Sequence, residues 1–288
     1  MKWQRGTQND DVVDVRGRKA PVGRIAAGGV GVTILVAVVA QLLGVDISGM
    51  FSDSGGGQTA QPQQQTGNPE PPKGEDPEAE MIEFIRFVMK DIQDAFEVEF
   101  KAAGKPYERA KLLVFRDVID TACGRSSSAI GPFYCPGDHQ AYIDLSFFRD
   151  LKARFGAPGD FAQAYVLAHE IGHHVQTLNG VEKQTRKMGR DERSRNAASV
   201  KQELQADCYA GVWGHSAQGK KILEIGDLEE AMNAAQAIGD DRLQKQAGVE
   251  VDPETFTHGS SAQRMKWFRR GYDTGKLEAC DTFSTSDL

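Results

Sequence analysis

Cysteine is scarce in this sequence, with four among 288 residues, and no two cysteines are spaced as C-x-x-C. Four-cysteine zinc sites are usually built from such pairs, so this class of structural site is disfavoured. Residues 1–24 contain six Lys/Arg and three Asp, a net charge of +3 against −7 for the whole chain. The rest of the chain therefore carries −10, which argues against nucleic acid as the partner of the folded part.

Charge is absent from residues 25–45, and apolar side chains are nearly absent from residues 52–77. An apolar helix of 21 residues is about 30 Å long, enough to span the hydrocarbon core of a bilayer. Its basic flank predicts residues 1–24 in the cytoplasm and the bulk of the chain outside, anchored in the membrane by a single pass. Residues 46–77 are expected to form a flexible linker. A cleaved signal peptide ending near Ala40 is the alternative, but the apolar run is longer than such peptides usually have.

The folded domain is expected to span residues 78–288, within the range of a single domain. Apolar residues between Met81 and Phe100 recur at helical spacing, and two strands are expected at residues 111–115 and 141–148. Further helices are expected at residues 160–178, 191–217, 227–246 and 260–272. The order helix, strands, helices predicts an α+β fold, mostly helical with a small sheet.

The segment that begins at His169 reads H-E-I-G-H-H and contains the pattern H-E-x-x-H. His169 and His173 are four residues apart on a predicted helix, so they lie on one face, one turn apart. Two imidazoles placed in this way can bind one Zn²⁺, and Glu170 can take a proton from a water molecule beside it. Asp160 is the expected N-cap of this helix. Packing alone explains the motif poorly, because these polar side chains would be costly to bury without partners.

A catalytic zinc site needs a third protein ligand and an open position. In the metzincin class that ligand would be a histidine at position 179, where this sequence has Asn179, so the class is excluded. Downstream, Glu203 and Asp207 are four residues apart on a predicted helix. One carboxylate can bind the metal while the other accepts the second N–H of a ligating histidine. The residues alone permit either assignment. The alternative to a metal site is an ordinary acidic helix face exposed to solvent.

In combination, H-E-x-x-H at 169–173 and E-x-x-A-D at 203–207 resemble the gluzincin-type zinc metallopeptidases, including the M48-like membrane proteases. Segments 131–136, 142–148 and 202–208 make the chain more closely similar to the bacterial putative neutral zinc metallopeptidase family typified by YpfJ. This resemblance implies a zincin-like fold, a Zn²⁺ cofactor and a protein or peptide substrate. It also implies an edge strand beside the active helix that pairs with an extended substrate.

The same resemblance assigns roles to individual residues. It implies Glu203 as the third zinc ligand and Asp207 as the partner of a ligating histidine. A Thr257-His258 turn followed by Arg264 is similar to one near the site of M48-like proteases, so His258 or Arg264 is expected to stabilise an oxyanion. Helix capping and packing is an equally good interpretation of that turn.

All four cysteines lie beyond the apolar run, in the part of the chain expected outside the cytoplasm, where disulfides persist. Cys123 and Cys135 flank a Gly/Ser-containing loop that can close locally. Closing it leaves Cys208 to pair with Cys280, one of the three pairings that four cysteines allow.

The sequence thus predicts a membrane-anchored zinc endopeptidase, in which Glu170 is the general base for hydrolysis by a zinc-activated water. The alternative is a catalytically inactive, membrane-tethered binding module that keeps the protease fold. Loss of the base or of a ligand would mark such a module, and neither is lost here. His174 lies about 100° round the helix from His173, so it is not expected to share the metal. His139 and His215 are expected to have hydrogen-bonded structural roles.

Overall fold

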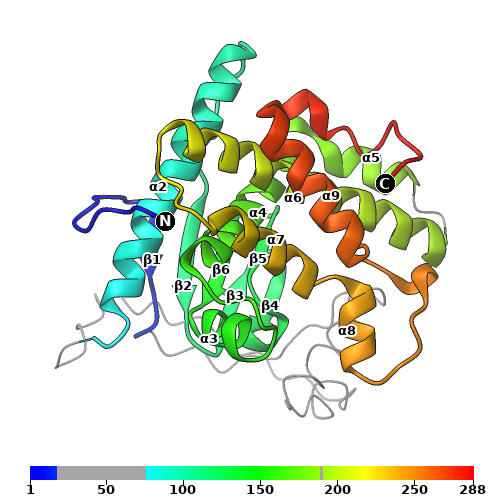
Figure 1. The fold of residues 1–288 in the computed structure, drawn as a ribbon, viewed down its shortest axis with the longest axis horizontal. Coiled ribbons are helices and arrows are strands. Elements are labelled where there is room, and N and C mark those ends of the chain that lie inside the picture. Colours follow the sequence, from blue (N-terminus) through cyan, green and yellow to red (C-terminus); the bar gives the residue numbers. More distant parts are fainter. Residues whose placement is uncertain (18–75, 189–190) are drawn as a thin grey trace, which may run out of the picture.

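The computed structural model describes residues 1–17, 76–188 and 191–288, and the structural statements below concern these ranges. They form one small sheet and one two-stranded hairpin, covered by helices drawn mainly from the second half of the chain (Figure 1). The predicted α+β class, mostly helical with a small sheet, is confirmed. None of the helices described is both long and apolar enough to cross a membrane. The transmembrane helix expected at residues 25–45 lies outside the described ranges.

The strands are β1 (Val12–Asp14), β2 (Lys111–Phe115), β3 (Val118–Thr121), β4 (Gly124–Ser127), β5 (Phe133–Cys135) and β6 (Gln140–Asp144). The helices are α2 (Ala79–Ala102), α3 (Ser146–Ala153), α4 (Asp160–Asn179), α5 (Val181–Met188), α6 (Glu192–Gly219), α7 (Asp227–Ala237), α8 (Asp240–Gln246) and α9 (Ser261–Thr274). Short 3₁₀ turns occupy Ser128–Ile130, Pro253–Thr255 and Leu277–Cys280.

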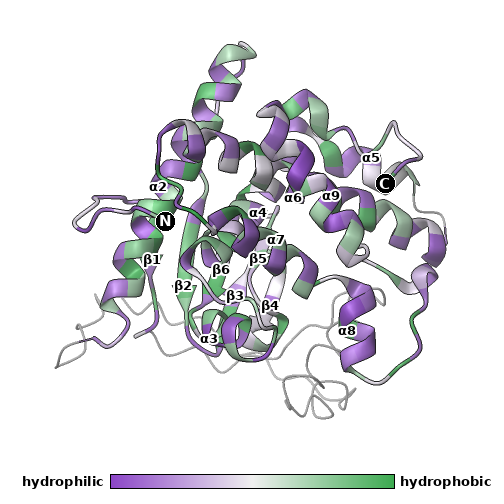
Figure 2. Cartoon of the chain, viewed as in Figure 1, coloured by the Kyte–Doolittle hydropathy of each residue, from purple (hydrophilic) through white to green (hydrophobic). Residues whose placement is uncertain are grey.

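The main sheet has the order β1-β2-β6-β5. β1, β2 and β6 run parallel, while β5 is antiparallel to β6 and forms an edge. The alternate residues Leu112 and Val114 of β2 are buried, as the period of a strand requires. In Figure 2 the hydrophobic colour lies on β2, β6 and along α2, whereas α8 is hydrophilic. The core is therefore centred on this sheet and the helices that pack against it.

Two expected elements end earlier than the sequence pattern suggested. The strand expected at residues 141–148 stops at Asp144, because the Asp144 carboxylate accepts a hydrogen bond from the Ser146 N–H (2.9 Å) and the chain turns into α3. The helix expected at residues 227–246 breaks into α7 and α8. Gly239 lies at that break, where a Cβ atom would be 2.4 Å from the Ser261 nitrogen.

Residues 1–17 lie against the domain (Figure 1). β1 pairs with β2 in parallel, with Val12 opposite Leu112. The sequence predicts a separate tail at residues 1–24 and a domain that begins at Glu78, but residues 1–17 pair with the domain through β1. A three-residue strand that pairs with a partner about 100 positions away leaves no periodic signal in the sequence.

The two intramolecular disulfides that were predicted are present, and of the three possible pairings the structure has Cys123–Cys135 with Cys208–Cys280. The second joins α6 to the C-terminal segment across 72 positions. It starts one residue after Asp207, so it restrains the helix that brings the predicted third ligand to the site. A cross-link over a loop of this size typically stabilises a fold by about 4 kcal/mol.

Helices α6 and α9 cross so closely that their backbones touch at two glycines. A Cβ atom on Gly211 would lie 2.0 Å from the carbonyl oxygen of Phe268. A Cβ atom on Gly271 would lie 1.9 Å from the carbonyl oxygen of Cys208. Neither contact can be relieved by rotating a side chain, so any larger residue must push the helices apart.

We expect Gly271→Ala to lower the free energy of unfolding by about 3 kcal/mol, because overpacking here displaces backbone. The matched control is Gly219→Ala at the last residue of α6, where no atom lies within 4 Å of the added methyl. That variant should change stability by less than about 1 kcal/mol. Urea unfolding with the disulfides intact measures both, and equal stability of the two variants would contradict the described helix crossing.

Candidate zinc site

Helix α4 carries the H-E-x-x-H motif and is fixed at both ends. At its start, Gly159 is the N-cap, and Glu230 of α7 accepts the hydrogen bond of the Phe161 N–H (3.1 Å). Asp160, expected as the N-cap, is instead the first helical residue, with its carboxylate 2.7 Å from the Met1 amino group. At its end, Gly180 adopts the left-handed conformation (φ 72°) that commonly terminates helices.

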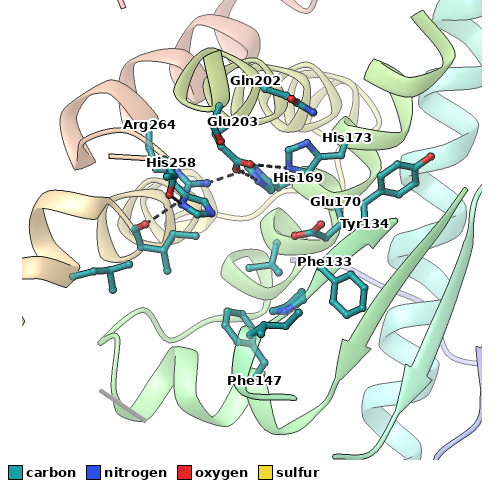
Figure 3. Close-up of a pocket in the computed structure, with 18 of the residues that line it drawn as sticks. Phe133, Tyr134, Phe147, His169, Glu170, His173, Gln202, Glu203, His258 and Arg264 are labelled. Carbon is teal, nitrogen blue, oxygen red and sulfur yellow. Dashed lines mark hydrogen bonds and ion pairs between the residues drawn. The ribbon is translucent and has the colours of Figure 1, made fainter. Parts of the chain in front are cut away.

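His169, His173 and Glu203 meet in one cluster, with ligand atoms all within 4.8 Å of one another (Figure 3). Glu203 comes from α6, and its carboxylate oxygens lie 3.1 Å from His169 Nε2 and 3.5 Å from His173 Nε2. The two helices approach closely at Gly172, where a Cβ atom would be 2.9 Å from the Ala206 carbonyl oxygen. The structure thus brings the three predicted ligands together, and their binding of zinc stays a prediction.

The two histidine rings are oriented by acceptors on their other nitrogens. His169 Nδ1 lies 2.9 Å from an Asp207 carboxylate oxygen, and His173 Nδ1 lies 2.9 Å from the Gln176 side-chain oxygen. Each acceptor favours a proton on Nδ1 and leaves the Nε2 lone pair facing Glu203. Two imidazole nitrogens and one carboxylate, pre-oriented in this way, are a donor set that fits catalytic zinc.

Asp207 is fully buried, and its charge is balanced by Arg264 of α9. The guanidinium donates from Nε and Nη2 to the two carboxylate oxygens (2.8 and 2.9 Å), and the Tyr165 hydroxyl donates a third hydrogen bond (2.5 Å). The sequence analysis named Arg264 as one candidate for stabilising an oxyanion. In the structure this guanidinium is held by Asp207, so its evident task is to keep Asp207 charged and in place behind His169.

The electrostatics of the cluster favour positive charge. Burial alone would lower the pKa of His169, but the carboxylates of Asp207 and Glu203 outweigh it and raise that pKa to about 10. Burial would raise the pKa of Glu203, yet the neighbouring His173, His258 and His169 hold it well below its usual range. Protons and a divalent cation would therefore compete for the same strongly attracting position.

Glu170 points into the cavity beside this cluster (Figure 3). Its side chain is largely buried, and burial raises the pKa of its carboxyl above the ordinary value, against the opposing effect of His169 and His173. A carboxylate with a raised pKa is a stronger base near neutral pH than an ordinary glutamate.

The cavity has a volume of about 930 Å³ and two chemically different walls. One wall is apolar and is formed by Phe133, Phe147, Phe155, Val166, Ile238 and Leu243. The polar wall is formed by Glu182, Glu192, Arg195, Asn196 and Ser199. In Figure 3, Phe133 and Phe147 lie on the same side of Glu170, away from Gln202.

His258 lies on the rim of the cavity and is anchored by Asp240, a residue that the sequence analysis missed. One Asp240 oxygen accepts hydrogen bonds from the N–H groups of Thr257, His258 and Gly259 (2.6–3.0 Å). The other oxygen is buried without a hydrogen bond, 3.5 Å from His258 Nδ1. Burial disfavours a charged ring, but Glu203 and Asp240 outweigh it and raise the pKa of His258.

The remaining histidines are held by groups outside the cluster. His174 is fully buried and lies 2.6 Å from the Glu108 carbonyl oxygen and 3.0 Å from the Tyr134 hydroxyl. His215 Nδ1 lies 2.8 Å from the Tyr272 carbonyl oxygen. His139 is partly exposed, 3.6 Å from the Glu108 carboxylate. These contacts agree with the structural roles expected for His139 and His215, and His174 does not belong to the cluster of predicted ligands.

Comparison with known proteins gives the following matches. A family described as putative neutral zinc metallopeptidase matches residues 1–283. The uncharacterized protein YpfJ of Escherichia coli (strain K12) is 45% identical over 295 residues, covering 99% of this chain and 100% of that protein. The uncharacterized protein Rv2575 of Mycobacterium tuberculosis (strain ATCC 25618 / H37Rv) is 47% identical over 196 residues, covering 63% of this chain and 65% of that protein. No solved structure matches.

Proposed function

The chain belongs to the putative neutral zinc metallopeptidase family, whose cofactor is zinc, and from that premise we propose that it is an endopeptidase. The observation that carries the proposal is the position of Glu170, which faces a large open cavity beside the cluster of His169, His173 and Glu203. A protein that only binds peptides has no need of a base at that position.

In this proposal His169, His173 and Glu203 hold the zinc ion. When bound there, zinc supplies Lewis acidity toward a carbonyl group and a lowered pKa for water. Glu170 accepts a proton from the attacking water and passes it to the leaving amine. Its burial keeps that proton from bulk solvent between the two transfers, which supports the assignment of one residue to both tasks.

His258 is proposed to donate a hydrogen bond to the carbonyl oxygen as negative charge develops on it. The Asp240 carboxylate supports this role in two ways. It fixes the backbone of the Thr257–Gly259 turn through three N–H groups, and it lies close enough to favour the protonated ring. Asp240 is thus a positioning residue that acts through His258.

The substrate backbone is proposed to lie along β5. This strand is an edge of the sheet, and two of its three residues, Phe133 and Tyr134, line the cavity. Free N–H and C=O groups on such an edge can pair with an extended peptide regardless of its sequence. The family resemblance implied an edge strand beside the active helix, and the strand expected at residues 141–148 is not that edge, because β6 lies inside the sheet between β2 and β5.

A mixture of short peptides incubated with the purified, zinc-loaded protein tests the proposal. We expect internal cleavage, detected as new termini by mass spectrometry, and its loss when a chelator removes zinc. Restored cleavage after zinc is returned would exclude damage by the chelator. Intact peptides after incubation with fully zinc-loaded protein would contradict the proposed activity.

The apolar wall predicts a preference at one residue beside the scissile bond. Phe147→Ala should reduce kcat/KM for peptides with Phe or Leu there by roughly 10-fold, because an apolar pocket contact typically contributes about 1–3 kcal/mol. Cleavage of peptides with Ala at that position should change little. Ser199→Ala, on the polar wall, is the matched control and should leave the ratio of the two substrates unchanged. An unaltered ratio in Phe147→Ala would place the specificity pocket elsewhere.

We further propose that the protein is attached to the membrane through residues 25–45 and that its domain works in an oxidising compartment. The two disulfides support the second part, since such bonds persist outside the cytoplasm. The uncharged apolar composition of residues 25–45 supports the first part.

A further inference from the structure

We propose that residues 1–17 are an integral part of the domain and lie on the same side of the membrane as its catalytic cavity. This inference departs from the expectation that a cytoplasmic tail precedes an external domain. It is independent of the peptidase activity, because it rests on contacts of a segment that does not line the cavity.

The first support is main-chain pairing. The Leu112 N–H donates to the Asp11 carbonyl oxygen (2.7 Å), and the Val15 N–H donates to the Val114 carbonyl oxygen (2.8 Å). These bonds continue the parallel β1–β2 ladder at both of its ends. Without β1, one side of β2 would present unpaired backbone groups, which folded proteins usually cover.

The second support is a charged side chain that only the domain satisfies. Asp11 is 8% exposed, so its carboxylate is nearly out of contact with solvent. It accepts hydrogen bonds from Arg109 Nε (2.7 Å), Gln93 Nε2 (3.0 Å) and Lys111 Nζ (3.2 Å). All three donors belong to the domain, and burying a carboxylate requires such partners. The docking is therefore specific in chemistry as well as in strand register.

Apolar contacts extend the docked surface in the direction of the N-terminus. Trp3 packs edge-on against Phe84 of α2, with ring centroids 5.7 Å apart. Met1 is buried in the main core, and the Lys2 N–H donates to the Ile222 carbonyl oxygen (2.8 Å). The segment thus touches the domain along its length.

The decisive support is the place where the segment ends. Arg16 lies 2.6 Å from the Asp76 carboxylate and 2.7 Å from the Glu78 carboxylate. A single crossing between positions 16 and 76 would put these residues on opposite sides of a hydrocarbon layer about 30 Å thick. The ion pairs exclude that separation within one molecule, so the membrane attachment that we propose through residues 25–45 has to leave residues 1–17 and the domain on one side.

Three of the six basic residues that predicted a cytoplasmic location lie outside the docked segment. They are Arg18, Lys19 and Arg24, whereas residues 1–17 contain the other three Lys/Arg.

A cysteine pair tests the docking in the full-length protein in its native membrane. Val13 and Leu113 are direct neighbours in the β1–β2 register. Neighbouring strands are about 4.8 Å apart, which lies within the range that a disulfide can bridge. Val13→Cys with Leu113→Cys should form an intramolecular bond, found by peptide mapping without reductant. Val13→Cys with Val249→Cys is the control and should not cross-link, because Val249 is exposed and comes three residues after α8, which Figure 1 shows far from β1.

Thiol labelling tests the side of the membrane. All four native cysteines are in disulfides, so a new cysteine is the free thiol. Gln8→Cys and Val249→Cys are single changes at exposed positions of the segment and of the domain. A membrane-impermeant maleimide should label both in intact cells, or both only after permeabilisation. Labelling of one without the other, a cross-link between chains, or no cross-link at Val13 and Leu113 would overturn the proposal.

Discussion

Purified Glu203→Ala protein should contain no zinc, whereas Asp207→Asn protein should retain zinc when the metal is in excess. Glu203 supplies the only carboxylate that meets both histidine Nε2 atoms among the described residues, so its loss leaves two ligands. Asp207 contacts the opposite nitrogen of His169, and loss of such a partner typically weakens zinc binding by about 10–100-fold. Zinc per protein after dialysis, measured by mass spectrometry of the metal, separates the two outcomes.

Asp207 is replaced by Asn and not by Ala in this experiment, because its carboxylate also neutralises Arg264. Asp207→Ala would leave a buried guanidinium without its partner and cost about 3–5 kcal/mol of folding stability. Asp207→Asn keeps the shape and an acceptor oxygen, so it isolates the effect on zinc. Stoichiometric zinc bound as tightly in Glu203→Ala as in the wild type would show that the third ligand lies elsewhere.

Glu170→Gln should keep stoichiometric zinc and lose peptidase activity by roughly 10²–10⁴-fold, the usual contribution of a general base. The change removes a buried carboxylate whose pKa is raised by burial, so the melting temperature should be unchanged or higher. Glu192→Gln is the matched control, since Glu192 also lines the cavity but is exposed at its rim. It should retain activity within about threefold. Wild-type turnover in Glu170→Gln would remove Glu170 from the mechanism.

The parts of the fold that could be predicted are those with short-range signals. The apolar stripe between Met81 and Phe100 locates α2. H-E-x-x-H locates α4, because two ligands four residues apart share one face only when the segment is helical. The short loop between Cys123 and Cys135 favoured a local bridge, although the sequence left all three pairings open, and the structure has that bridge together with Cys208–Cys280.

The parts that could not be predicted depend on contacts between distant positions. β1 gains its structure only by pairing with β2, and β5 is a three-residue strand with no periodic pattern of its own. Phe147 and Phe148 extend an apolar run that suits a strand and a helix equally, and the Asp144 turn decides between them.

In the site, too, local features could be predicted from the sequence and long-range contacts could not. Two histidines and a base on one helix are specified locally, whereas Arg264, Tyr165 and Asp240 acquire their roles only when helices pack. Arg264 stands on an otherwise ordinary amphipathic helix, and no local pattern marks it as the counter-charge of Asp207. Charged residues at buried helix positions are the general signal that could have identified such a network.

We propose that Glu170, beside a cluster loaded with zinc, would direct a water molecule onto a peptide bond. Digestion of one cleavable peptide in water enriched in ¹⁸O follows the oxygen of that water. Wild-type protein with zinc should introduce one ¹⁸O atom into the new C-terminal carboxylate, at a rate that Glu170→Gln reduces in proportion to its loss of turnover. Products without ¹⁸O, or equal incorporation rates in the two proteins, would contradict this role of Glu170.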